Sequence, residues 1–168
     1  MRSIILVAHN IRSCHNVGSL FRTAEGLGVD KIIISGYTPY PSLHKADPRM
    51  PHEASRVSSR IAKTALGSEN MVPWYVTQDL AGDLLDYSSA GYTIAALEQT
   101  KSAIQLPDYA PPHKIVLLLG NELMGVDPSL LEEYKTHLVI PMYGQKESFN
   151  VVQAAAMTLF WLRFAYNR

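Results

Sequence analysis

The sequence predicts an α/β fold with a mostly parallel sheet flanked by helices. Short aliphatic runs of strand length alternate with segments of helical periodicity. Most of the strand candidates are continuously apolar, which is typical of parallel strands buried on both faces. With 168 residues and 47% hydrophobic content, the chain can bury one substantial core, so we expect a single domain over residues 1–168.

The first three elements form a predicted βαβ unit. Ser3 to Ala8 and Lys31 to Ser35 are β-branched and aliphatic runs. Between them we predict a helix with Asn16 as its N-cap and Gly28 as its stop signal. Strand, helix and strand follow one another within the roughly 30 residues of such a unit.

The remainder of the chain continues this alternation. Prolines in residues 36–52 and 98–113 can continue neither a helix nor a strand, so two long loops are expected there. Asp127 and Pro128 have the character of an N-cap and a first helical residue. We predict further strands over Val72 to Thr77, Tyr92 to Leu97, Ile115 to Leu119 and Leu138 to Ile140, and helices near 53–65, 78–86 and 128–134.

The last predicted helix runs from Ser148 to about Tyr166 and is apolar on nearly every face. A helix of this kind must be buried all round. Because a terminal helix of a small chain rarely finds such cover alone, we predict a homodimer in which this helix packs against a partner. Burial within one chain remains the alternative.

The cysteine and histidine content argues against several kinds of site. Cys14 is the single cysteine, so neither an internal disulfide nor a cysteine-based zinc cluster can form within one chain. We do not expect a thiol nucleophile at Cys14 beside His15, and the other histidines lack metal-ligand spacing, so no metal site is predicted. No apolar stretch is long enough for a secretory signal or a membrane span, which favours a cytoplasmic protein without membrane contact.

The charge is neutral overall but unevenly distributed. Zero net charge argues against a nucleic-acid binder that relies on bulk charge. However, residues 1–63 hold nine Lys and Arg against four acids, whereas residues 64–168 hold six against eleven. A basic face can therefore exist on a neutral protein.

Three polar segments, residues 15–29, 117–127 and 140–155, each follow a predicted strand. In open parallel sheets the ligand crevice lies at the carboxyl ends of the strands, so these segments predict a ligand site. Glycines at 120 and 125 would let backbone approach a ligand closely, although a tight turn explains them equally well.

The third segment also contains the predicted start of the final helix. Ser148 is expected to cap this helix, which is an ordinary role for serine, and Asn150 is expected inside the first turn, where a polar partner would explain it. In the first segment, Arg22 emerges from an apolar helical neighbourhood. It could hold a phosphate or a developing oxyanion, or be an ordinary solvated arginine.

Taken in order, these segments resemble the three motifs of the SpoU/TrmH family of RNA ribose methyltransferases. The matching residues are Asn16 to Arg22, then Gly120, Asn121, Glu122 and Gly125, and then Ile140, Pro141 and Met142 followed by Ser148, Phe149 and Asn150. The resemblance implies S-adenosylmethionine-dependent methyl transfer to a ribose 2′-hydroxyl of tRNA or rRNA. It also implies a C-terminal trefoil knot, which no sequence pattern could have predicted, because knots are very rare.

The resemblance implies roles for individual residues. Arg22 would stabilise the emerging alkoxide or clamp a phosphate, and whether it also acts as a base stays open because a guanidinium holds its proton tightly. Phe149 stands where a leucine is usual in the motif. The implied catalytic residues are Arg22, Asn16, Glu122, Ser148 and Asn150, and the implied cofactor-binding residues are Leu97, Gly120, Ile140, Met142, Ser148 and Phe149.

Candidate RNA contacts come from the basic part of the chain. Arg56, Arg60 and Lys63 share one face of a predicted helix, but a solvated charged face is the alternative. The predicted contacts are Arg12, Lys45, Arg49, Arg56, Arg60 and Lys63. No separate RNA-binding domain is expected, so a catalytically idle RNA-binding relative stays open. A flavodoxin-like phosphate or nucleotide enzyme is a weaker reading, because the chain lacks a P-loop or GxGxxG signature.

Overall fold

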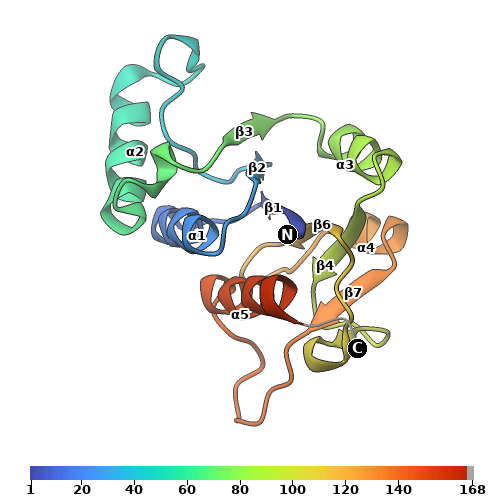
Figure 1. The fold of residues 1–168 in the computed structure, drawn as a ribbon. Coiled ribbons are helices and arrows are strands. Elements are labelled where there is room, and N and C mark those ends of the chain that lie inside the picture. Colours follow the sequence, from blue (N-terminus) through green and yellow to red (C-terminus); the bar gives the residue numbers. More distant parts are fainter. Residues whose placement is uncertain (166–168) are drawn as a thin grey trace.

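The computed structural model describes residues 1–165, the side chain of His44 excepted, and its centre is a parallel sheet (Figure 1). Within these residues seven strands pair in the order β3-β2-β1-β6-β4-β7-β5. Each strand pair is parallel. The strands are β1 Ser3–His9, β2 Lys31–Ser35, β3 Trp74–Thr77, β4 Thr93–Leu97, β5 Ile104–Gln105, β6 Lys114–Leu119 and β7 Thr136–Val139. The predicted α/β fold is therefore confirmed.

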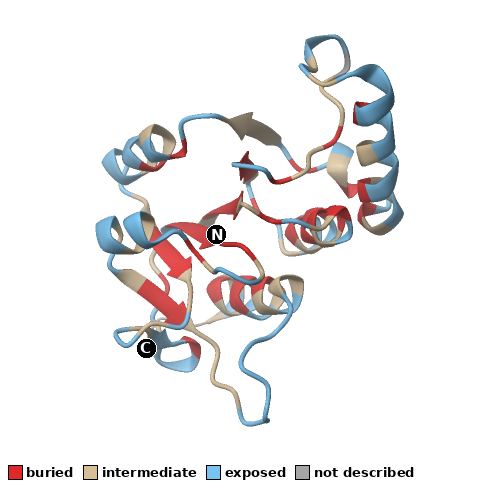
Figure 2. Ribbon diagram, turned by 180° about the vertical axis from the view of Figure 1, so that it is seen from behind, coloured by how far each residue is buried: buried red, intermediate tan, exposed pale blue. Residues whose placement is uncertain are grey.

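Helices cover both faces of the sheet. The α-helices are α1 Cys14–Gly26, α2 Pro51–Ala65, α3 Leu80–Ser89, α4 Pro128–Glu133 and α5 Val151–Phe164, with 3₁₀ turns η1 His44–Ala46, η2 Ser68–Asn70 and η3 Leu106–Asp108. Alternate residues of β1 pack into two cores, one with α1, α2 and α5 and the other with α3 and α4. Figure 2 shows the central strands buried while the outer helix surfaces are exposed. Burial on both faces explains why the strands are continuously aliphatic.

Two predicted helix starts were wrong, and both corrections concern the candidate site. Helix α1 is capped by Ser13, whose side chain accepts a hydrogen bond from the backbone N–H of Asn16 (3.3 Å). Helix α5 is capped by Asn150, whose side chain accepts from the N–H of Val152 (2.9 Å), while Ser148 lies before the helix. Asparagine and serine are both good N-caps, so sequence alone could not choose between neighbours. The predicted helix end near Tyr166 lies outside the described residues.

Helices α1 and α2 pack closely at Gly18. A Cβ built on Gly18 would lie 2.2 Å from both the Ile61 carbonyl oxygen and Thr64 Oγ1. The Thr64 hydroxyl donates a hydrogen bond to the His15 carbonyl oxygen at 2.8 Å. This contact fixes α2, and with it the exposed basic side chains of that helix, against the first motif.

The loop before α2 is fastened by Arg49. The guanidinium forms an ion pair with Asp47 (2.6 Å), donates to the Tyr40 carbonyl oxygen (2.9 Å) and lies 3.8 Å above the Tyr40 ring. Hydrogen bonding from Arg49 holds the pKa of Asp47 well below its ordinary value. Arg49 is thus occupied within the loop, so the structure does not favour its predicted contact with RNA.

Helix α5 is buried on one side only. Ala155, Leu159 and Leu162 belong to the core, whereas Phe160 and Phe164 are 58% and 57% exposed and contact each other in a tilted arrangement, with ring centroids 4.8 Å apart. Complete burial of this helix within one chain is therefore not observed. Within residues 1–165, no helix is both long and apolar enough to cross a membrane.

Candidate active site

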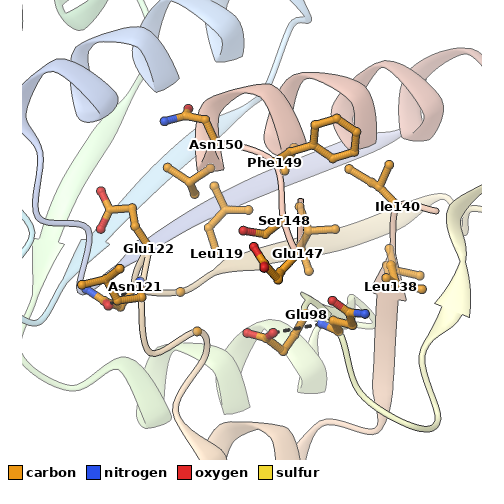
Figure 3. A pocket seen from close by; sticks show the side chains of 18 of the residues that line it. Glu98, Leu119, Asn121, Glu122, Leu138, Ile140, Glu147, Ser148, Phe149 and Asn150 are labelled. Carbon is orange, nitrogen blue, oxygen red and sulfur yellow. Dashed lines mark hydrogen bonds between the residues drawn. The ribbon is translucent and has the colours of Figure 1, made fainter. Parts of the chain in front are cut away.

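The second and third polar segments, together with the end of β4, line a cavity of about 400 Å³ at the carboxyl ends of β4, β6 and β7 (Figure 3). The cavity is lined by residues 97–99, 119–123, 125, 138–140, 142, 147–151 and 154. The six predicted cofactor residues, Leu97, Gly120, Ile140, Met142, Ser148 and Phe149, are all among them. So are Glu122 and Asn150, and a ligand at this place would contact two of the three predicted motifs.

The second motif is a tight backbone loop. Asn121 and Gly125 exchange reciprocal N–H to carbonyl hydrogen bonds of 2.9 Å. A Cβ on Gly120 would lie 2.4 Å from the backbone of Gly125, so glycine is required for the loop to close on itself. Closure of the loop therefore explains the glycine without any ligand, which is the alternative to the predicted role in ligand approach. The loop nevertheless forms one wall of the cavity.

Glu98 fastens this loop to the end of β4. Its carboxylate accepts hydrogen bonds from the backbone N–H of Val126 (2.8 Å) and of Gln99 (2.9 Å). Gly125 has φ = 73°, and a Cβ there would lie 2.2 Å from the Glu98 carboxylate. Glycine at 125 therefore satisfies both the backbone conformation and the position of Glu98.

One chain of side-chain hydrogen bonds joins all three motifs at the rim of the cavity. Asn16 Nδ2 donates to Glu122 Oε1 at 2.9 Å, and Asn150 Nδ2 donates to Asn16 Oδ1 at 3.4 Å. A carboxylate only accepts, so the amide nitrogen of Asn16 must face Glu122 and its oxygen must face Asn150. This orientation depends on the corrected helix starts, because Ser13 provides the cap of α1 and leaves the Asn16 side chain available.

Glu122 is held in its ionised form. Burial of its carboxyl raises the pKa, but hydrogen bonds from the Arg12 backbone N–H and the Asn16 amide outweigh that effect and hold the pKa below its ordinary value. The Arg12 N–H lies 3.1 Å from Glu122 Oε2. A carboxylate stabilised in this way is a weak proton acceptor, so its geometry suits positioning of Asn16 better than general base catalysis.

Ser148 and Glu147 also line the cavity, and they lie between Glu122 and Ile140 in the view of Figure 3. Both are exposed, and the Ser148 hydroxyl makes no hydrogen bond to any residue in the described part of the chain. Ser148 is therefore free to bind a ligand in the cavity. The structure contradicts only its predicted role as a helix cap, because Asn150 caps α5.

Arg22 is not brought to the cavity of its own chain. It is exposed on α1, it does not line the cavity, and among residues 1–165 nothing is hydrogen-bonded to its guanidinium. Asn16 and Arg22 are six residues apart, which places them about 120° apart around the helix axis at 3.6 residues per turn. Since Asn16 faces Glu122, Arg22 must point elsewhere.

The predicted RNA-binding residues other than Arg49 are exposed. Arg56, Arg60 and Lys63 lie on α2, and Lys45 lies in the preceding loop. None of them forms an ion pair with a residue that the structure describes. No group of three or more His, Cys, Asp or Glu side chains within the described chain could hold a metal ion.

A polar network behind the second motif was missed by the sequence analysis. Asn121 is buried, and its Nδ2 donates to the Asn10 carbonyl oxygen (3.0 Å) and to Tyr37 Oη (2.8 Å). Its Oδ1 accepts from the N–H groups of Leu123 and Met124. The motif names Asn121, but no spacing links it to Asn10 or Tyr37, which come from other loops.

Solved structures share this fold. The A. aeolicus TrmH/SpoU tRNA modifying enzyme matches with a TM-score of 0.78 and 25% identity over 97% of this chain and 75% of its own. An AdoMet-bound rRNA methyltransferase from Sinorhizobium meliloti matches with a TM-score of 0.76 and 22% identity, over 96% and 56% of the two chains. The class of fold is therefore that of tRNA and rRNA methyltransferases.

Residues 3–160 match the SpoU rRNA Methylase family, and the chain belongs to that family. This confirms the family predicted from the three motifs. The 23S rRNA (guanosine(2553)-2′-O)-methyltransferase RlmP of Bacillus subtilis is 27% identical over 161 residues, 95% of this chain and 57% of that protein. The tRNA (guanosine(18)-2′-O)-methyltransferase of Aquifex aeolicus is 28% identical over 161 residues, 95% and 68% of the two chains. The chain thus spans little more than half of the first relative.

Proposed function

We propose that this protein transfers a methyl group from S-adenosylmethionine to a ribose 2′-hydroxyl of tRNA or rRNA. The observation that carries the proposal is the chain of hydrogen bonds from Glu122 through Asn16 to Asn150, at the rim of a cavity built by the second and third motifs. Family membership supports it, as does the activity named for the two relatives.

The cavity fits the proposed cofactor chemically. Its lining combines apolar side chains suited to an adenine ring, such as Leu138 and Ile140, with the carboxylates of Glu98, Glu122 and Glu147. No lysine or arginine of the described chain lines it. An acidic, partly apolar cavity matches a ligand that carries a sulfonium and an ammonium group beside a base. The residues that would hold this ligand are Leu97, Gly120, Ile140, Met142, Ser148 and Phe149.

The cofactor would supply an electrophilic methyl group, and the protein would align the hydroxyl with it. Asn16 Oδ1 and Ser148 Oγ can each accept a hydrogen bond from a ribose hydroxyl, and Asn150 Nδ2 can donate one to its oxygen. As the methyl group leaves the sulfonium, which becomes a neutral thioether, the hydroxyl proton would pass to solvent. Glu122 keeps Asn16 in this orientation. Alignment of the two reacting atoms is the main contribution that such a site can make to an in-line transfer.

Arg22 and the basic residues of α2 would serve the RNA. Arg56, Arg60 and Lys63 present three unpaired cations on one exposed helix, to which Arg12 and Lys45 add two more. We also propose that the exposed Phe160 and Phe164 of α5 pack against a second copy of the chain, as expected for an apolar helix face in a dimer.

The test is to incubate the purified protein with labelled S-adenosylmethionine and total RNA, then to separate the RNA by size. Label is expected in one size class, at ribose 2′-oxygens, and should fall by about 100-fold or more with Arg22→Ala if that side chain stabilises the alkoxide. Lys31→Ala, on the far end of β2, is the matched control and should leave the label unchanged.

Cofactor binding without label in any RNA would contradict the proposed reaction. RNA binding under the same conditions would then support the alternative, a catalytically idle RNA-binding relative. Label in the tRNA or the rRNA fraction names the substrate class.

A further inference from the structure

Tyr37 is the most exposed aromatic side chain next to the polar network of the second motif. It follows β2 in the loop that leads towards α2, and it is 60% exposed. Single exposed aromatic side chains are common on protein surfaces and require no explanation. What distinguishes Tyr37 is how firmly the protein holds it.

Both ends of Tyr37 are anchored. Its backbone N–H donates to Asn10 Oδ1 at 3.2 Å, and its hydroxyl oxygen accepts from Asn121 Nδ2 at 2.8 Å. The preceding Gly36 has φ = 64°, and a Cβ there would lie 1.9 Å from Asn10 Oδ1, so glycine allows Asn10 to keep its contact with Tyr37. The ring is therefore fixed in place while its surface remains open to solvent.

The anchor lies at the proposed catalytic site. Asn121 lines the cavity and directly precedes Glu122, whose carboxylate orients Asn16. The backbone N–H of Arg12, an exposed residue, also donates to Glu122. A firmly held and exposed aromatic ring thus lies one hydrogen bond away from Asn121, a residue that lines the cavity.

We propose that the ring of Tyr37 is a stacking platform for a nucleobase of the RNA substrate, next to the nucleotide that is methylated. The inference rests on the proposed function and names the form of RNA it acts on. A base can stack on an aromatic side chain only when it is unpaired and turned outward, so the substrate presents a single-stranded loop or bulge.

The test compares Tyr37→Ala, which removes the ring, with Tyr37→Phe, which removes only the anchoring hydroxyl. For Tyr37→Ala the KM for the RNA found in the labelling assay should rise roughly 5- to 100-fold, the range for loss of one stacked base. Tyr37→Phe should stay within about 3-fold of the wild type, because the ring remains. Leu85→Ala, an equally exposed residue on α3, is the control and should not change KM.

Three results would overturn the platform. One is an unchanged KM for Tyr37→Ala, and another is an equal loss in Tyr37→Phe, which would assign the effect to the anchor instead of the ring. The third is a changed cofactor affinity or oligomeric state in Tyr37→Ala. If the wild type methylates no RNA, the proposed function fails separately. The platform is then tested with Tyr37→Trp, which adds a fluorescent side chain at this position. Single-stranded RNA should quench that fluorescence, and duplex RNA should not.

Discussion

Asn16 is the residue on which the geometry of the site depends, because its amide contacts the other two motifs at once. We expect Asn16→Ala to lower the rate of methyl transfer by roughly 10- to 100-fold, the effect of losing a hydrogen bond to a charged group. Cofactor affinity should be unchanged, since Asn16 does not line the cavity. Single-turnover methylation and calorimetric binding of the cofactor measure the two quantities separately.

A double-mutant cycle identifies the partner of Asn16. If Glu122 acts by orienting Asn16, then Glu122→Gln should add little to the loss already caused by Asn16→Ala, because the two residues form one unit. Independent, fully additive losses would mean that Glu122 contacts the reacting groups itself.

His9 makes the network behind the second motif sensitive to pH. Tyr37 N–H donates to Asn10 Oδ1, so the amide nitrogen of Asn10 faces His9 Nε2 at 2.9 Å, and this ring nitrogen must be an unprotonated acceptor. The other ring nitrogen lies 2.8 Å from Ser35 Oγ. Burial lowers the pKa of His9 from its ordinary 6.5, against an opposing effect of Asp127.

The sign of the pH effect follows from that direction. A histidine whose pKa is lowered by folding contributes stability that is fully present above 6.5 and is lost as pH falls through the lower folded value. Between pH 7.5 and pH 5, the free energy of unfolding in urea should therefore decrease more for the wild type than for His9→Asn. An equal loss in both proteins would show that His9 is not the group responsible.

At the scale of elements, the packing of α1 on α2 depends on one missing Cβ. Gly18→Ala should destabilise the fold by about 1–3 kcal/mol, because the new methyl group overlaps α2 backbone. Gly26→Ala in the same helix is the matched control. A Cβ at Gly26 meets no atom within 4 Å, so this change should be neutral or slightly stabilising in urea unfolding.

Helix α2 should contribute affinity for RNA without sequence preference. Replacing Arg56 and Arg60 by alanine should weaken RNA binding and reduce the slope of log K against log salt by roughly 2, because two phosphate contacts are lost. Filter binding at several salt concentrations measures the slope. Arg49→Ala makes a contrasting variant, since Arg49 is occupied inside its loop and its loss should lower stability more than the salt slope.

The elements differ in how much of them the sequence could predict. The central strands and α1 were found because their apolar patterns extend over many residues, whereas the start of α4 was indicated by Asp127 and Pro128. Strand β5 was missed because Ile104–Gln105 is a two-residue, exposed edge strand without any pattern of its own. The predicted N-caps Asn16 and Ser148 were wrong, and the caps are Ser13 and Asn150. Serine and asparagine cap helices about equally well, so only tertiary contacts decide between them.

The candidate site was predictable to a similar degree. Motif resemblance named several of the residues that line the cavity. The position of the site was predictable because loops at the carboxyl ends of neighbouring parallel strands converge. It could not place Tyr37 or His9, whose contacts are made with residues distant in sequence. Nor could it indicate that Arg22 points away from the cavity of its own chain.

At the scale of the whole molecule, the position of Arg22 and the exposed face of α5 lead to one expectation. We propose that, where a second copy covers Phe160 and Phe164, Arg22 of one protomer completes the cavity of its partner, because it does not line the cavity of its own chain. A site shared between protomers would explain why both features remain exposed in a single chain.

Mixing two inactive variants decides this. In equal mixtures of Arg22→Ala and Asn150→Ala chains, a shared site restores one complete cavity in each mixed dimer, giving about a quarter of wild-type activity for random pairing. A site within one chain restores nothing. Adding Phe160→Glu to both chains should abolish the recovery, because a charge on the apolar face of α5 opposes pairing, and recovery that survives this change would place the protomer contact elsewhere.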